Sequence, residues 1–175
     1  MLARLLAQAR GEPIQMVDSV FTDVPVEAWY AREVGYLAHQ GIVVGRGDNL
    51  FAPQEPITRR EFAVLLARFW ASLGKQMTQI SQTLPADVPE TDWAAGAIRT
   101  AAGMGWFQVN EAGDFCPDDS LRRAESVVIL NRILGRRPNH RYITGHLHQL
   151  NTFTDVDPDH WAWYDILEAA NDHIA

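Results

Sequence analysis

The stretch "FTDVPVEAW" at residues 21–29 returns as "FTDVDPDHW" at residues 153–161, and a tryptophan closes both copies at the same distance from the aspartate. A weaker copy, "LPADVPETDW" at residues 84–93, again sets a tryptophan six places after an aspartate. Self-similarity along a chain is typical of repeat architectures, in which each copy forms one supersecondary unit. Three copies therefore indicate a fold that is assembled from repeats.

The similarity extends well beyond this phrase. A shift of 64 residues, without a gap, aligns the following pairs: Asp23 with Asp87, Trp29 with Trp93, Gly41 with Gly105, Phe51 with Phe115, Pro53 with Pro117, Arg59 with Arg123, Glu61 with Glu125 and Arg68 with Arg132. We assign repeat 1 to residues 21–72, repeat 2 to residues 84–135 and half of a third repeat to residues 153–175. Together with residues 1–10, these units are expected to form a single domain over residues 1–175.

The spacing of apolar residues divides repeat 1 into parts. Residues at intervals of three and four predict a first helix, and a glycine at its end is typical of a helix C-terminus. They are Tyr30, Val34, Leu37 and Gly41. The stretch "GIVVGRGDNLFAPQEP" at residues 41–56 then predicts a structured loop, because glycine and proline punctuate it.

A second helix is predicted to begin at Thr58. Glu61 follows three residues later, which is the capping-box spacing in which each side chain bonds the other residue's backbone N–H. An apolar stripe continues along the helix at Phe62, Leu65, Leu66 and Phe69. Each repeat is therefore helix, loop, helix. One such pair is too small to bury its own stripe, so several pairs must pack together.

We predict an all-α fold of six principal helices, with short strands allowed in the loops. The predicted helices span residues 1–8, 28–40, 59–72, 92–104, 122–134 and 160–173, to within ~2 to 4 residues at each end.

The first ten residues also fit the repeat. "MLARLL" at residues 1–6 matches "LLARFW" at residues 65–70, so residues 1–10 are interpreted as the second helix of a repeat whose first half is absent. We expect this helix to pack beside the C-terminal half-repeat, or to complete a second molecule in a dimer that exchanges terminal helices. The apolar residues that this packing would bury are Leu2, Leu5, Leu6, Trp161 and Ile166.

Bulk composition narrows the functional classes. The chain of 175 residues is 47% apolar and 21% charged, which is typical of a globular protein. Its net charge of −7 argues against a general nucleic-acid binder, because such proteins need basic surface. No apolar run is long enough to span a membrane. Residues 1–10 do not resemble a signal peptide, so an exported protein would contain this chain as a mature form or a fragment.

Three motifs together resemble the S-layer homology repeat: "FTDVPVEAW", "GIVVGRGDNLFAP" and "ITRREF". The resemblance covers most of the chain except residues 11–20, 73–83 and 136–152. It implies an α-helical arrangement of three repeats about a pseudo-threefold axis. It also implies a secreted protein at the bacterial cell surface that binds cell-wall polysaccharide without covalent attachment. The polymer bound by such repeats usually carries acidic pyruvyl groups.

Repeat 2 departs from this pattern at three positions. Val109 replaces the loop glycine, Arg122 replaces the threonine that starts the second helix, and Ser126 replaces an apolar residue of the stripe. We therefore expect repeat 2 to be degenerate as a binding site.

Arg59 and Arg123 are the candidate ligand contacts, because a guanidinium offers a planar fork of donors that matches a carboxylate. In the expected groove of repeat 1, Gly45 would let backbone N–H groups approach the ligand, Thr58 and Asp48 would order the groove, and Glu61 would fix the helix start. Arg59 has an alternative structural role, since the same arginine could pair with a carboxylate of a neighbouring repeat.

Two other residue types, tryptophan and aspartate, recur at equivalent positions in the three copies. Trp29, Trp93 and Trp161 could stack on sugar rings, and Trp29 is kept as a candidate ligand contact, but a core position where repeats meet is favoured. The aspartates that open each copy are expected to cap helices. They are Asp23, Asp87 and Asp155.

Metal, cofactor and enzyme functions are not predicted. The acidic stretch at residues 155–160 has His160 where a calcium loop needs glycine, and the histidines of residues 140–148 lack zinc-site spacing. The acidic residues recur with the repeat, and no nucleophile with a partner base can be named. The expected function is non-catalytic anchoring to an acidic wall polysaccharide, which the resemblance implies to be pyruvylated. The alternative is a degenerate structural repeat that serves protein contacts or S-layer self-assembly.

Overall fold

A computed structural model describes residues 1–75 and 83–171. Within these ranges the helices are α1 (Leu2–Arg10), α2 (Ala31–His39), α3 (Arg59–Ser72), α4 (Ala95–Gly103), α5 (Arg123–Leu134), α6 (His140–Gly145), the 3-10 helix η1 (Leu147–Gln149) and α7 (Trp163–Ala170). The predicted all-α fold is confirmed. Strand-like pairing in the described ranges is limited to one isolated antiparallel bridge between Thr58 and Ser120. No described helix is long and apolar enough to cross a membrane.

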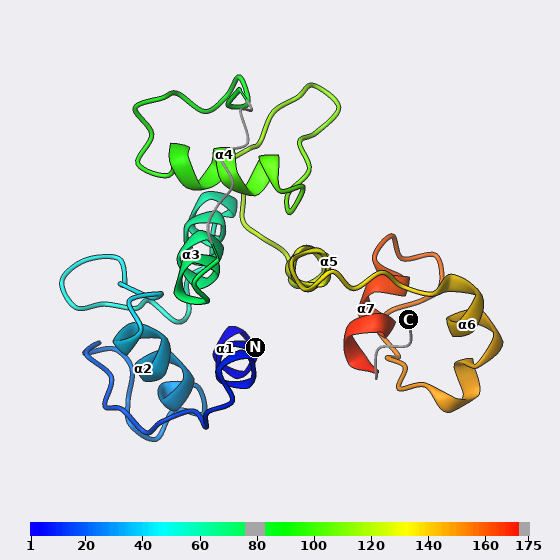
Figure 1. The fold of residues 1–175 in the computed structure, drawn as a ribbon, viewed down its shortest axis with the longest axis horizontal. Helices are drawn as coiled ribbons and strands as arrows, with labels where there is room; N and C mark the ends of the chain where they lie inside the picture. Colours follow the sequence, from blue (N-terminus) through cyan, green and yellow to red (C-terminus); the bar gives the residue numbers. More distant parts are fainter. Residues whose placement is uncertain (76–82, 172–175) are drawn as a thin grey trace.

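The helices form three groups around a common centre (Figure 1). The second helices of the repeats, α1, α3 and α5, lie nearest this centre, and α2, α4 and the α6–α7 group lie outside them. Each outer first helix packs against the central helix that precedes it in the chain, as α2 on α1, α4 on α3 and α7 on α5. The sequence repeats as a first helix, a loop and a second helix. Each packed pair instead combines the second helix of one repeat with the first helix of the next.

Burial of the apolar stripes explains this arrangement. Leu6 of α1, Leu66 of α3 and Ile98 of α4 are each 0% exposed and belong to one hydrophobic cluster that extends through both full repeats. Full burial of such side chains stabilises a fold by roughly 1.5 to 3 kcal/mol each. A single helix pair could not enclose these residues, so the central helices depend on their neighbours.

The start of α3 follows the predicted capping box. The hydroxyl of Thr58 accepts a bond from the Glu61 N–H, and the Glu61 carboxylate accepts one from the Thr58 N–H at 2.8 Å. In repeat 2 the Arg122 N–H still donates to Glu125 at 2.8 Å. An arginine side chain has no acceptor, so the reciprocal half of the box is lost there.

Three first helices begin later than predicted. They were expected from residues 28, 92 and 160, but α2, α4 and α7 start at Ala31, Ala95 and Trp163. A turn occupies the intervening residues, as shown by the bonds from Ala31 N–H to Ala28 C=O and from Ala95 N–H to Asp92 C=O. The predicted end of the last helix at residue 173 lies outside the described residues.

Helix α6 was not predicted from the sequence. It has only six residues, so it shows no long apolar period. Asn139 caps it by accepting a bond from the Tyr142 N–H, and its Ile143 is buried against Trp163 and Leu167 of α7. The connector between repeats 2 and 3 is therefore a folded element, although no helix was predicted there.

The predicted packing of the N-terminal helix is wrong. Leu2 and Leu6 of α1 belong to the main cluster of the two full repeats. Trp163 and Leu167 of α7 form a separate cluster with α6. Trp161, the expected partner of α1, is 61% exposed. The physical reason is that α1 already packs on α2, and α7 already packs on α5 and α6.

Replacing Leu6 with alanine should lower the free energy of unfolding by about 2 to 5 kcal/mol, because the substitution leaves a cavity in the main cluster. Leu134→Ala is the matched control, since Leu134 ends α5 and is 41% exposed. Denaturant titration of both variants measures the difference. Equal stabilities for the two variants would mean that α1 is not part of the core.

Candidate functional site

An aspartate ties the beginning of each full repeat to its loop. Asp23 accepts bonds from the Phe51 N–H at 2.8 Å and the Ala52 N–H at 2.6 Å. Asp87 accepts the equivalent bonds from the N–H groups of Phe115 and Cys116, also at 2.8 and 2.6 Å. We call each set an aspartate clamp. The prediction that these aspartates cap helices is wrong, because their partners are loop N–H groups 28 and 29 residues later.

The clamp holds the loop in an unusual backbone conformation. Ala52 and Cys116 have φ values of 58° and 55°, in the left-handed region that residues with side chains seldom adopt. The carboxylate compensates by satisfying the N–H of each residue. The Phe51 N–H, helped by that of Ala52, holds the pKa of Asp23 below its ordinary value, although burial acts in the opposite direction. The clamp therefore holds Asp23 as a carboxylate.

Repeat 1 carries a cleft between its loop, α3 and the start of repeat 2. This first cleft has a volume of about 590 Å³, and its lining includes Gly45, Arg46, Glu61, Arg68 and Trp93. Arg46 donates to the Pro56 carbonyl at 2.7 Å and pairs with Glu61 at 2.8 Å. Arg68 is half-buried and makes no side-chain hydrogen bond or ion pair within the described residues. The first cleft thus holds a guanidinium that is free to bind a ligand.

Glu61 is the acidic counterpart in this cleft. Its partial burial would by itself raise its pKa, but bonds from the Thr58 backbone, the Arg46 guanidinium and the Thr58 hydroxyl together lower it below the ordinary value. Glu61 therefore stays ionised, and it is occupied by the helix start and by Arg46.

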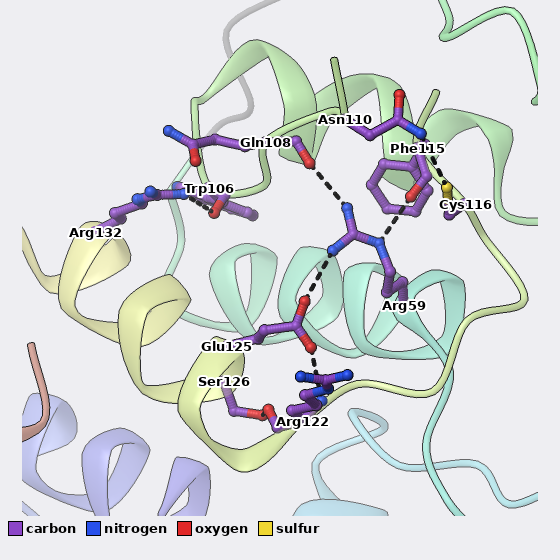
Figure 2. Close-up of polar contacts among 10 residues, drawn as sticks. All are labelled: Arg59, Trp106, Gln108, Asn110, Phe115, Cys116, Arg122, Glu125, Ser126 and Arg132. Carbon is purple, nitrogen blue, oxygen red and sulfur yellow. Dashed lines mark hydrogen bonds and ion pairs between the residues drawn. The ribbon is translucent and has the colours of Figure 1, made fainter. Parts of the chain in front are cut away.

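Repeat 2 carries an equivalent second cleft, lined by residues that include Gln108, Asn110, Cys116, Arg122 and Glu125. Arg59 of repeat 1 also lines it. Figure 2 shows the Arg59 guanidinium directed toward Gln108, Phe115 and Glu125.

Three N–H groups of Arg59 are engaged by repeat 2. Nε donates to the Phe115 carbonyl at 2.7 Å, and Nη2 donates to the Gln108 carbonyl at 2.9 Å. Nη1 lies 3.5 Å from the Glu125 carboxylate. The guanidinium also lies over the rings of Phe107 and Phe115, at 5.3 and 4.9 Å from their centroids. The side chain is only 13% exposed, so Arg59 joins the two repeats.

This geometry corrects the expected groove. Arg59 was predicted to lie in the cleft of repeat 1, but its guanidinium lies in the cleft of repeat 2. The reason is that the start of α3 runs beside the loop of repeat 2, where the Arg59 N–H donates to the Asp119 carbonyl at 2.9 Å. Arg123, the equivalent residue, is exposed and makes no side-chain bond within the described residues.

The other predicted residues do not all come together. Gly45 and Glu61 line the first cleft, and Thr58 is bonded to Glu61 beside it. Gly45 is needed for packing within its own loop, because a Cβ there would meet the Leu50 carbonyl and the Phe21 ring. Asp48 is exposed on the loop, with φ of 48°.

The favoured core position of the tryptophans is wrong. Trp29, Trp93 and Trp161 are 89%, 63% and 61% exposed. Each lies in the turn before a first helix, and in repeats 2 and 3 the following residue, Ala94 or Ala162, is buried in its place. Trp93 lines the first cleft, whereas Trp29 lines a different cleft beside α1.

Sequence reasoning missed Arg46 and Arg68 as cleft residues. Arg68 recurs as Arg4 and Arg132, so its periodic position was visible in the repeat alignment. The direction in which it points depends on the packing of α3 beside Trp93, which the sequence does not specify. Arg46 has no equivalent charge in repeat 2, where Asn110 replaces it.

Comparison with known protein families matches the same segments. The family profile of the S-layer homology domain matches residues 20–63 and 86–125. The chain belongs to the S-layer homology family. Each matched segment of this S-layer homology protein contains one aspartate clamp and one capping glutamate.

Several similar proteins have names that refer to anchoring or to the cell surface. The chain is 33% identical to a cellulosome-anchoring protein of Acetivibrio thermocellus over 173 residues, which cover 98% of this chain and 37% of that protein. It is 30% identical to cell surface glycoprotein 1 of the same organism, over 89% of this chain and 7% of that protein. It is 33% identical to a cell surface protein of Thermoanaerobacter kivui, over 66% of this chain and 15% of that protein. The S-layer homology chain thus spans less than half the length of these relatives. No solved structure matched it.

The aspartate clamp predicts a pH-dependent stability. Because the folded-state pKa of Asp23 is lowered, its contribution is complete above the unfolded-state pKa of about 3.9 and is lost as the pH falls through the folded-state pKa. Asp23→Asn should therefore melt at a lower temperature than the wild type at neutral pH, and the difference should shrink in acid. Asp155→Asn is the control, because Asp155 is exposed and makes no side-chain bond within the described residues. If the difference in melting temperature between Asp23→Asn and wild type were the same at every pH, the clamp would be contradicted.

Arg59→Ala should destabilise the fold by about 1.5 to 3 kcal/mol, because it removes the charged donor from the carbonyl of the buried Phe115 and from that of Gln108. Arg59→Lys should recover little of the lost stability, since an ammonium group cannot reproduce the planar set of N–H donors of a guanidinium. Arg123→Ala removes the equivalent but unbonded arginine and should stay within about 0.5 kcal/mol of wild type. Denaturant titration compares the three variants. A loss for Arg123→Ala equal to that for Arg59→Ala would exclude a special role of the inter-repeat bonds.

Proposed function

We propose that the chain is a non-catalytic anchoring module that binds an acidic cell-wall polysaccharide at the bacterial surface, outside the cell that secretes it. Membership of the S-layer homology family supports this function. Similarity to a protein named for cellulosome anchoring and to cell surface proteins supports it further. The remaining argument concerns which residues of this chain would hold the polymer.

The first cleft carries the proposal. It combines Arg68, whose guanidinium has no partner in the described residues, with the exposed indole of Trp93. An arginine can hold a carboxylate through two parallel bonds, and an exposed indole face can pack on the apolar face of a sugar. The two groups come from different repeats, so the folded cleft presents both to one ligand. The acidic group of the polymer would bind Arg68, and a neighbouring sugar ring would stack on Trp93.

The predicted ligand residues take revised roles in this proposal. Arg59 would support the loop of the second cleft. Only those N–H groups of Arg59 that are not already bonded could contact a ligand there. Glu61 and Thr58 would keep Arg46 and the helix start in place beside the first cleft, and Gly45 would shape its loop. Arg123, Asp48 and Trp29 would lie outside the first cleft and contribute less to affinity.

The engagement of the carboxylates supports a binding function over catalysis. Asp23 and Asp87 accept two backbone N–H bonds each, and Glu61 and Glu125 bond the starts of α3 and α5. A glycosidase would need a pair of carboxyl groups that are free to exchange protons with the substrate. These four acids are instead used to hold the repeat together.

Self-association is the second candidate. A structural repeat that serves S-layer assembly would use exposed apolar groups such as Trp29, which is 89% exposed. A dimer formed by exchange of terminal helices stays a prediction. Burial of Leu2 and Leu6 within one chain argues that α1 does not need a second chain to cover it.

Arg68→Ala should weaken binding of purified wall polysaccharide by about ten- to a hundred-fold, because a charge-assisted contact contributes on the order of 1.5 to 3 kcal/mol. Trp93→Ala should weaken it as well. Arg99→Ala is the charge-matched control, since Arg99 pairs with Glu90 on the surface of repeat 2. Calorimetry at fixed salt measures the affinities. The first cleft would be excluded if Arg68→Ala and Arg99→Ala bound the polymer equally well.

A further inference from the structure

The connector after repeat 2 has a charge opposite to that of the rest of the chain. Residues 126–154 contain four arginines and no aspartate or glutamate, so their net charge is +4. The whole chain carries −7, and the other residues therefore carry −11. We call residues 126–154 the basic connector. It includes the end of α5, α6 and η1.

Three of its four arginines make no side-chain hydrogen bond or ion pair within the part of the chain that the structure describes. Arg132 donates to the Trp106 carbonyl at 3.2 Å and is occupied (Figure 2). Arg137 and Arg141 are exposed, Arg136 is half-buried, and none of the three side chains makes a hydrogen bond or ion pair with the described residues. In a chain with a large excess of acids, unpaired arginines in one folded segment mark a surface for an external anion.

A polar cleft lies against this surface. Arg136 and Tyr142 line it together with Gln149 and Asn151, and the end of α7 closes it. Amide and phenol groups beside a guanidinium are suited to hydroxyl and carboxylate groups. The shape of this segment is fixed by α6, where the rings of Tyr142 and His146 stack at 4.1 Å and Ile143 is buried. The cleft therefore sits on a folded element that is absent from the two matched repeat segments.

We propose that Arg136, Arg137 and Arg141 of the basic connector bind carboxylate groups of an acidic polysaccharide, at a surface separate from the two repeat clefts. This inference rests on the proposed function, because the same polymer would be held at a second surface. Exposed ion pairs are individually weak, so the connector adds to the affinity of the first cleft and makes binding sensitive to salt. Two linked contacts raise the total affinity without a tight second site.

The charge distribution favours a polysaccharide over a nucleic acid. A nucleic-acid surface needs many cations along a phosphate track, because each neutralised phosphate adds to affinity by releasing counterions. Here three free arginines stand on a chain whose residues outside the basic connector carry −11. A polymer with at most one carboxylate per sugar can meet these arginines, whereas duplex DNA, with one charge per roughly 1.7 Å of its axis, would be repelled more strongly by the remaining surface.

The test uses the complete chain and three polymers: polygalacturonate as the carboxylate probe, neutral dextran and duplex DNA. Arg137→Gln/Arg141→Gln is compared with Gln8→Glu/Gln15→Glu, because both double variants lower the net charge by two and all four positions are exposed. Affinity is measured between roughly 50 and 200 mM salt. The arginine variant should bind polygalacturonate about 2- to 30-fold more weakly at low salt, and its salt slope should fall by about two. The control should match wild type, and dextran should not bind.

Equal affinities for the two double variants would overturn the proposal, as would duplex DNA that competes as well as polygalacturonate. Arg136→Gln provides an independent check, since it alters the cleft without touching the exposed pair. The same variants are then tested on purified wall polysaccharide. Weak binding by Arg68→Ala together with unchanged binding by the arginine double variant would reject the connector and keep the proposed function. Absence of wall binding by the wild type would reject the proposed function, while the polygalacturonate result would still decide on the connector.

Discussion

The Arg59 guanidinium makes the most extensive of the polar contacts that join the two repeats, beside the pairs of Arg60 with Asp92 and Asp118. Arg59 begins α3 in repeat 1, yet its donors end on two carbonyls and a carboxylate of repeat 2. A planar fork suits this position, because three N–H groups can point to three acceptors without a change of rotamer. The backbone runs beside it in the same way, through the bridge between Thr58 and Ser120. Arg59 therefore forms part of the lining of the second cleft, where the start of α3 meets the loop before α5.

This use of Arg59 makes the two clefts chemically different. The first cleft has Arg46 paired with Glu61, which leaves Arg68 free beside an exposed indole. In the second cleft asparagine replaces Arg46, and the arginine of the preceding repeat takes its place beside Glu125. Residues at equivalent positions in the two repeats therefore have different chemical roles, since the other repeat contributes part of the lining of each cleft.

The spacing of residues along the sequence was sufficient to predict the structural features that depend on near neighbours in the chain. The all-α class, the capping box of Thr58 and Glu61, and helix α3 at residues 59–72 are confirmed. Side-chain direction was not predictable in this way. The tryptophans lie in the turns before their helices and are exposed, and Asp23 finds its partners 28 and 29 residues away. Helix α6 was missed because its six residues, capped by Asn139, are too few to show the periodic spacing of apolar residues that predicts a helix.

The aspartate clamp also bears on the order in which the chain folds. Asp23 and Asp87 each close a loop of 28 residues within their own repeat, whereas Arg59 reaches Phe115 across 56 residues. Doubling the length of a closed loop adds about 0.6 kcal/mol of entropic cost. Closure within each repeat is thus the less costly step, and it presents the Phe115 carbonyl that Arg59 later binds. The chain can assemble as two closed loops that then dock, so that the entropy of each short closure is lost before the longer contacts between repeats form.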